Sequence, residues 1–295
     1  MNIYVLSLGF GIITASILAI ASVGFTLQFG VTNVLNLAYG DVMTGSAFVA
    51  YLVTRVGGGL AEALIAGAGA GAIGSWGLNR FVYTPFVRRG TRLFGMIIVT
   101  ISVSLILQNG LQAAFKATFF SLVLPRPSSY TFAGMIFTSQ QLVIIALAVA
   151  AMVLVHALLS WTKLGRAMRA TAADPELARS CGIATDRVID VAWLLSGALC
   201  GTAGVTLALN ISSFTSTTGG QFLIPLIAAA VLGGVGSPYG AMVGAVVIGL
   251  SSELSASVIS PDYKEVIAFS ILIVVLLIRP QGIFAEVATQ KEVVA

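Results

Sequence analysis

The chain has 295 residues, of which 58% are hydrophobic and only 9% are charged, and its mean hydropathy is +1.01. Soluble domains carry about 25% charged residues, so this composition excludes an ordinary soluble protein. Apolar stretches of about 18 or more residues recur between short polar patches, which is typical of polytopic helical membrane proteins. The net charge of +4 is small, and we expect no nucleic-acid partner.

The apolar pattern predicts an all-α fold, with a single membrane domain over residues 1–295 and eight or nine transmembrane helices. Segment 31–53 is the ambiguous one because polar residues interrupt it, and polar backbone at membrane depth is tolerated only where protein or water surrounds it. We favour a broken or re-entrant element there, which gives eight spans and an N-terminus inside, whereas nine crossings would place the N-terminus outside. The candidate spans are 4–29, 34–53, 60–78, 93–115, 140–161, 188–210, 222–236, 239–258 and 266–278.

The basic residues are distributed unevenly between the loops. Eleven of the fifteen fall in three segments, and the positive-inside rule places these segments, with the C-terminus, in the cytoplasm. The three groups are Arg80, Arg88, Arg89 and Arg92; Lys163, Arg166, Arg169, Arg179 and Arg187; and Arg279 and Lys291. The same alternation places Arg55, Lys116, Arg126 and Lys264 outside.

Polar residues inside predicted spans are candidates for a translocation path, because buried polar and ionisable groups are costly in lipid and often functional. The alternatives are hydrogen bonds between helices and positions at span ends that water reaches. The candidate path residues are Asn33, Asn36, Asp41, Gln108 and Asn109. Glycine pairs at a spacing of four, such as Gly67 with Gly71 and Gly197 with Gly201, predict close helix packing.

A basic stretch at 164–188 lies between long apolar runs and must therefore sit at a membrane surface. Its Asp174-Pro175-Glu176 sequence predicts a helix start, and Gly182 predicts its end. We expect a short helix at 175–181 that exposes an apolar ridge suited to docking in a groove of another protein. The ridge residues are Leu177, Ala178 and Cys181, with Arg179 beside them. The alternative is a surface helix that binds anionic lipid.

Catalytic and metal-binding patterns are absent from the sequence. The single histidine, His156, lies in an apolar stretch, and the two cysteines, Cys181 and Cys200, form no metal-ligand spacing. There is no phosphate-binding loop of the G-x-x-x-x-G-K-[ST] type. We therefore expect neither an enzyme nor a cofactor or metal, and any ATP hydrolysis must occur on another chain.

Four stretches together resemble the permeases of the branched-chain amino acid ABC transporter family. They are residues 24–41, 80–109, 165–183 and 228–249, the last followed by RPQGIF at 279–284. The second carries an Arg-x-x-Tyr-x-Pro pattern, and the fourth carries GGVGSPYG. The chain departs from the family pattern at Asn79, Thr84, Pro175 and Arg179, which puts the shape of the first cytoplasmic loop in question.

The resemblance implies a permease subunit in the bacterial cytoplasmic (inner) membrane, which imports a small polar solute, most simply a branched-chain amino acid. It implies two ATP-binding subunits, a second homologous permease (a different or an identical chain) and an extracytoplasmic substrate-binding protein as partners in the bilayer. Urea or a short-chain amide is the alternative substrate. A stand-alone channel or secondary transporter is the alternative of another class. The residues expected to couple to the ATPase are Gly165, Arg166, Ala173, Asp174, Leu177, Ala178, Arg179 and Gly182.

Overall fold

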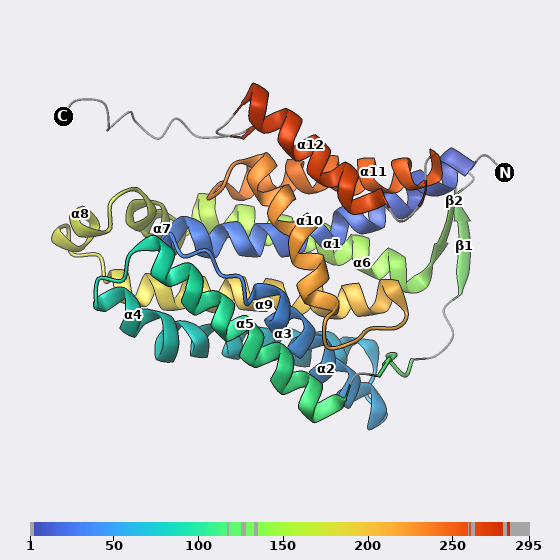
Figure 1. Ribbon diagram of the computed structural model, residues 1–295, viewed down its shortest axis with the longest axis horizontal. Helices are drawn as coiled ribbons and strands as arrows, with labels where there is room; N and C mark the ends of the chain where they lie inside the picture. The colour runs from blue at the N-terminus through green and yellow to red at the C-terminus, as the bar shows by residue number, and fades with distance from the viewer. Residues whose placement is uncertain are drawn as a thin grey trace.

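The computed structural model describes residues 3–116, 118–124, 128–132, 135–258, 260, 263–279 and 282–283. The all-α prediction is confirmed, with the addition of one antiparallel hairpin (Figure 1). The elements are α1 (Ile3–Thr32), α2 (Tyr39–Arg55), α3 (Leu60–Leu78), the π-helix η1 (Asn79–Tyr83), α4 (Thr84–Arg88), α5 (Leu93–Phe115), β1 (Ser129–Phe132), β2 (Met135–Thr138), α6 (Ser139–Trp161), α7 (Lys163–Ala173), α8 (Pro175–Ser180), α9 (Thr185–Ile211), α10 (Thr218–Gly233), α11 (Pro238–Val258) and α12 (Lys264–Ile278). Arg126, Lys291 and residues 280, 281 and 284 lie outside the described residues.

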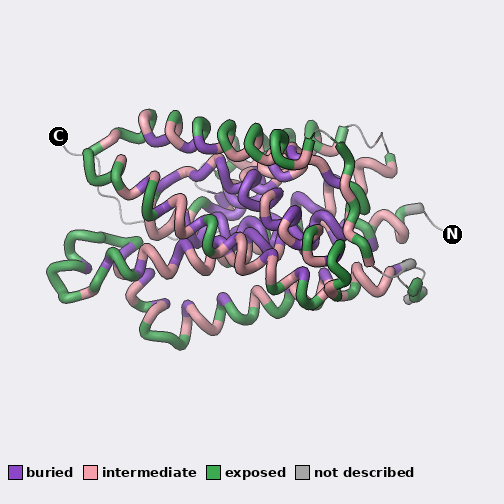
Figure 2. Tube along the Cα trace, turned by 90° about the horizontal axis from the view of Figure 1, so that it is seen from below, coloured by how far each residue is buried: buried purple, intermediate pink, exposed green. Residues whose placement is uncertain are grey.

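Five helices in the described part of the chain are long and apolar enough to cross a membrane. They are Tyr4–Thr32, Leu93–Phe115, Ser139–Trp161, Thr185–Ile211 and Pro238–Val258. Buried residues gather at the centre of the molecule, whereas the outer helices turn one face outward (Figure 2). Large apolar side chains such as Phe94 and Leu277 lie on these outward faces, each 80% exposed. Such a surface suits hydrocarbon rather than water.

The two ends of the molecule differ in character (Figure 1). One end carries α4, α7, α8 and the start of α9, where most of the arginines lie, and we call it the basic end. The other carries β1 and β2, and we call it the hairpin end. Helix α1 begins at the hairpin end, where Gly9 lies against Met135, and it ends beside Gly236 near the basic end.

Helices α1 and α9 form the core, and glycines allow their neighbours to approach closely. A Cβ atom at Gly71 of α3 would lie 2.3 Å from the carbonyl oxygen of Gly197, and one at Gly201 would lie 2.2 Å from that of Gly67. Contacts this short leave no room for a side chain, so the glycine pairs are required for the α3–α9 packing. The packing role predicted for these glycines is confirmed.

Two helices begin at a break inside the bundle. Helix α1 ends at Asn33, whose φ is 52°, and residues 33–38 are not helical before α2 begins. Helix α9 likewise ends at Ser212, whose φ is 60°, and residues 212–217 separate it from α10. The break predicted in 31–53 is therefore present, and the second break was not predicted. The sequence placed the start of the later span at residue 222, four residues after α10 begins.

The segment after the first break is not re-entrant: α1 runs from the hairpin end towards the basic end, and α2 runs back to the hairpin end. Tyr51 of α2 contacts Phe120, and the amide of Val123 donates to Thr54 Oγ1, so α2 continues to the loop at the hairpin end. The amide of Ile283 donates to the carbonyl of Leu232, near the α10–α11 turn. The described ends of the chain thus lie at opposite ends of the molecule, so the favoured placement of both termini on one side was wrong.

The elements α1–α2–α3 and α9–α10–α11 repeat one arrangement in opposite orientation. Each unit has a long helix, a residue of positive φ, a six-residue break, a shorter helix and a further helix. The starts of the two shorter helices meet, since the amide of Gly219 donates to Thr44 Oγ1 at 2.9 Å. A Cβ at Gly40 would lie 2.3 Å from the carbonyl oxygen of Gly219. Inverted repeats with broken helices at their interface are characteristic of transporters.

Candidate functional site

The predicted surface helix is present as α8, and the residues expected to build it do so. Asp174 Oδ1 accepts hydrogen bonds from the amides of Glu176 and Leu177 at 3.0 and 2.9 Å, and Pro175 occupies the first turn. Gly182, with φ of 84°, follows the end of the helix. These are the capping features that stabilise a short helix in isolation from a core. The preceding helix α7, which contacts α8, was not predicted.

Helix α8 projects at the basic end, clear of the membrane helices (Figure 1). Leu177 is 61% exposed, and Cys181 is also exposed. The expected ridge is wrong at Ala178, which is only 4% exposed. The chain folds back over this residue, because the amide of Ile183 donates to the Ala178 carbonyl at 3.0 Å. Leu177 is therefore the large apolar side chain that α8 exposes.

The other predicted coupling residues divide into exposed and packed ones. Arg166, Ala173, Asp174 and Arg179 are exposed around α7 and α8. Gly165 is buried instead, and a Cβ there would lie 2.3 Å from the carbonyl oxygen of Leu158. Gly165 thus sets the tight corner between α6 and α7 rather than a docking surface.

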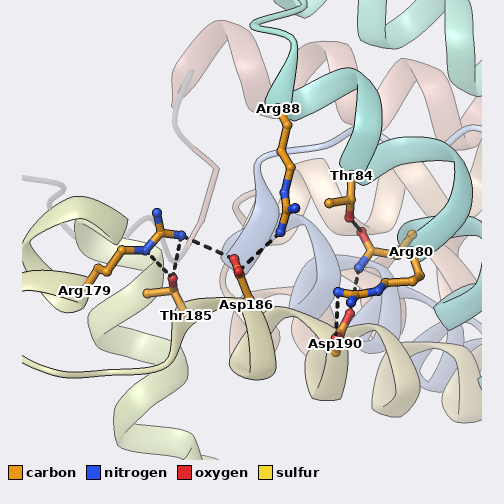
Figure 3. Close-up of polar contacts among 8 residues, drawn as sticks. Arg80, Thr84, Arg88, Arg179, Thr185, Asp186 and Asp190 are labelled. Carbon is orange, nitrogen blue, oxygen red and sulfur yellow. Dashed lines mark hydrogen bonds and ion pairs between the residues drawn. The ribbon is translucent and has the colours of Figure 1, made fainter.

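An ion-pair network connects α8 to α9 and to α4 (Figure 3). Asp186 accepts from both Arg88 and Arg179, each at 3.3 Å, and Arg179 also donates to Thr185 Oγ1 at 2.9 Å. A second acid, Asp190, lies 3.7 Å from the guanidinium of Arg80. Exposed pairs of this kind contribute only about 0–1 kcal/mol each to stability. Their significance is positional: they join the projecting helix to two membrane-side elements. Sequence reasoning did not find this network.

Two of the polar candidates in the membrane, Asp41 and Gln108, lie close together. Asp41, in the first turn of α2, is 2% exposed and accepts a hydrogen bond from Ser104 of α5. Gln108 lies one turn further along α5. A Cβ at Gly220 of α10 would lie 3.9 Å from Asp41 Oδ1 and 4.0 Å from Gln108 Nε2. The acid and the amide thus face one small space between α2, α5 and α10.

The outward face of α5 is polar along part of its length. Asn109 is exposed, with its amide nitrogen donating to the Leu105 carbonyl at 2.7 Å, and Ser102 and Gln112 are exposed on the same helix. Gln221 of α10 is exposed as well. Amides on the surface of an apolar helix favour a water-filled cavity or another protein over lipid. We call the surface formed by α5 and the first turn of α10 the α5–α10 face.

Asn33 and Asn36 lie apart from this group, in the break after α1. Asn33 is exposed and ends α1, whereas Asn36 is fully buried and accepts a hydrogen bond from the Tyr83 hydroxyl at 2.9 Å. Tyr83 belongs to η1, next to α4 at the basic end. The structure therefore gives Asn36 a structural contact instead of a place beside Asp41.

A cluster of aromatic side chains packs between α2 and the loops at the hairpin end. Phe48 stacks on Phe115 with ring centroids 4.1 Å apart, and its ring also contacts Phe120 and Phe214. Phe120 and Phe214 exchange backbone hydrogen bonds of 2.9 and 2.8 Å. The second break is thereby held to the loop at the hairpin end.

Comparison with known proteins identifies the family of this chain. A model of the branched-chain amino acid transport system permease component matches residues 7–276. The chain belongs to this permease family. The LivH permease of Salmonella typhimurium, named for high-affinity branched-chain amino acid transport, is 32% identical over 95% of both chains. Escherichia coli K12 LivH is 31% identical and Pseudomonas aeruginosa BraD is 30% identical, both over 95% of each chain.

A solved structure supports the fold of this permease independently. PsaBC from Streptococcus pneumoniae, in complex with a Fab, aligns with a TM-score of 0.53 at 14% sequence identity. The alignment covers 92% of this chain and 91% of that one, so the likeness extends through the whole bundle. With the family match and the apolar helices, it establishes a multi-pass membrane permease subunit.

Proposed function

We propose that this chain is the permease subunit of an ATP-driven, binding-protein-dependent importer of branched-chain amino acids in a bacterial inner membrane. The observation that carries the proposal is the match, over 95% of the chain, to permeases named for high-affinity branched-chain amino acid transport. In this role the chain forms part of the transmembrane path. ATP hydrolysis takes place on two separate ATP-binding subunits, and the chain needs no cofactor of its own.

The two surfaces described above suit the partners that this function requires. Helix α8, with Leu177 exposed, docks on an ATP-binding subunit, and the basic end with the C-terminus faces the cytoplasm. The α5–α10 face lines the path against a second permease, either a homologous or an identical chain. The substrate-binding protein docks at the hairpin end.

The experiment is purification from native membranes in mild detergent, identification of the co-purifying chains by mass spectrometry, and reconstitution in liposomes. We expect an ATP-binding chain and a second permease, and ATP-dependent uptake of labelled leucine when the binding protein is added. Uptake of urea or acetamide instead of leucine would show that the chain is a permease of an amide importer. A chain that transports alone and without ATP would contradict the proposal.

A further inference from the structure

Among the residues that the structure describes, the buried carboxylate of Asp41 has no cationic side chain paired with it. It is 2% exposed, at the level where α2 and α10 begin inside the bundle. In the part of the chain that the structure describes, the four ion pairs involve Asp186, Asp190 and Glu253, and none involves Asp41. An acid within a membrane domain is costly to keep, and its usual explanation is a functional one.

The immediate surroundings of Asp41 leave one side of the carboxylate free for a ligand. Ser104 donates to Oδ2, whereas Oδ1 lies on the side of Gly220. The Gln108 amide nitrogen lies 4.0 Å from the Cβ position of Gly220, so an acceptor and a donor both approach this point. An α-amino acid carries a cationic and an anionic group on neighbouring atoms, which complements such a pair.

The space is reachable from the proposed path. Gly220 and Gln108 are both half-buried, and their sequence neighbours Gln221 and Asn109 are exposed on the α5–α10 face. The neighbouring Gly219 has no room for a side chain, because a Cβ there would lie 2.0 Å from the carbonyl oxygen of Gly40. Gly219 is thus required by packing, whereas at Gly220 the acid and the amide approach the backbone only to ordinary contact distance, and no side chain stands between them and α10.

We propose that Asp41 receives the α-ammonium group of the transported amino acid, with the Gln108 amide donating to its carboxylate and Gly220 providing the room. This inference rests on the proposed function, since it requires a zwitterionic substrate. The rival explanation is structural: a carboxylate in the first turn of α2 interacts favourably with the helix dipole and the Ser104 hydroxyl.

The test compares variants of the complete transporter, with its ATP-binding subunits and second permease, in liposomes supplied with the binding protein. Asp41→Asn keeps the size of the side chain and an acceptor for Ser104 but removes the charge. We expect ATP-dependent leucine uptake to fall about tenfold or more, as when a hydrogen bond to a charged group is lost. Assembly and the thermal midpoint should stay at wild-type values. Wild-type uptake, or a fall in uptake that only accompanies lost assembly or a lower thermal midpoint, would overturn the inference.

Gly220→Ala provides a second variant that leaves Asp41 in place. The added methyl makes only ordinary contacts at 3.9 and 4.0 Å, so the fold is retained while the space is filled. Uptake should again fall severalfold. The matched control is Gly69→Ala on α3, where no atom of the described chain lies within 4 Å of the Cβ position, and there uptake should not change. Wild-type uptake by Gly220→Ala overturns the inference even if Asp41→Asn fails to fold.

The same assay separates this inference from the proposed function. If the wild-type complex imports no amino acid, the proposed function fails and the ammonium site fails with it. If the wild-type complex imports leucine and both variants do too, the function stands and only the role of Asp41 is refuted.

Discussion

Replacing Leu177 with alanine tests whether α8 is the element that docks on the ATP-binding subunit. Full burial of a leucine side chain contributes about 1.5–3 kcal/mol. Because Leu177 is 61% exposed in the free subunit, docking can remove about that fraction, which is worth about 1–2 kcal/mol. The variant should therefore bind the ATP-binding subunit roughly 5- to 30-fold more weakly.

The assay is a titration of the purified ATP-binding subunit against the permease in lipid nanodiscs, with Kd as the readout. The thermal midpoint should not change, since the side chain packs little within the subunit. Leu142→Ala is the control, because Leu142 is 43% exposed on α6, toward the hairpin end. An unchanged Kd for Leu177→Ala, with normal ATP-driven uptake, would refute docking through α8. Ala178 is unsuited to this test because it is buried, and a charged residue there would disturb the helix itself.

Three further substitutions probe the bundle and the network. Tyr83→Phe removes the hydroxyl that donates to buried Asn36 and should destabilise the permease by about 1–3 kcal/mol. The thermal midpoint should therefore fall, and an unchanged midpoint would contradict the importance of this contact. Gly201→Leu brings a Cβ within 2.2 Å of a backbone oxygen of α3 and should abolish the yield of folded protein, whereas Gly69→Leu should not; equal yields would refute the packing role. Asp186→Asn breaks two exposed ion pairs, so the free energy of unfolding should fall by less than about 1 kcal/mol while uptake falls. Wild-type uptake would show that the network plays no part in coupling.

Features encoded by neighbouring residues could be predicted from the sequence, and α8 is the clearest case. Asp174, Pro175 and Gly182 act within a few residues of one another, so the helix, its cap and its end follow from local rules. The burial of Ala178 could not be predicted, because it depends on the chain that folds back after Gly182. Helix α7 is short and polar, and no apolar run marks it.

Features that depend on distant residues were found only in part. Asp41 and Gln108 were both candidates because of their polarity, but only the fold shows that they share the space beside Gly220. The second break lies in a serine- and threonine-rich run at 212–218, which lacks the asparagines and the aspartate that marked the predicted break in 31–53. The inverted repeat leaves no obvious sequence periodicity. It becomes visible through the matching positive φ angles of Asn33 and Ser212.

The departures from the family pattern gather at one place in the structure. Thr84 donates to Asn79, Asn79 donates to Asp190, and Arg179 pairs with Asp186. Three positions that looked unrelated in the sequence thus take part in the polar contacts around the start of α9 (Figure 3).

The two breaks are held from opposite ends of the molecule, and this bears directly on transport. The first break is held from the basic end, through the hydrogen bond from Tyr83 to Asn36. The second is held from the hairpin end, through the paired backbones of Phe120 and Phe214. The helices that follow the breaks touch each other at Gly40 and Gly219, beside Asp41. Transporters place their substrate sites where broken helices of inverted repeats meet, and here two breaks anchored to different ends of the bundle lead into helices that meet beside Asp41.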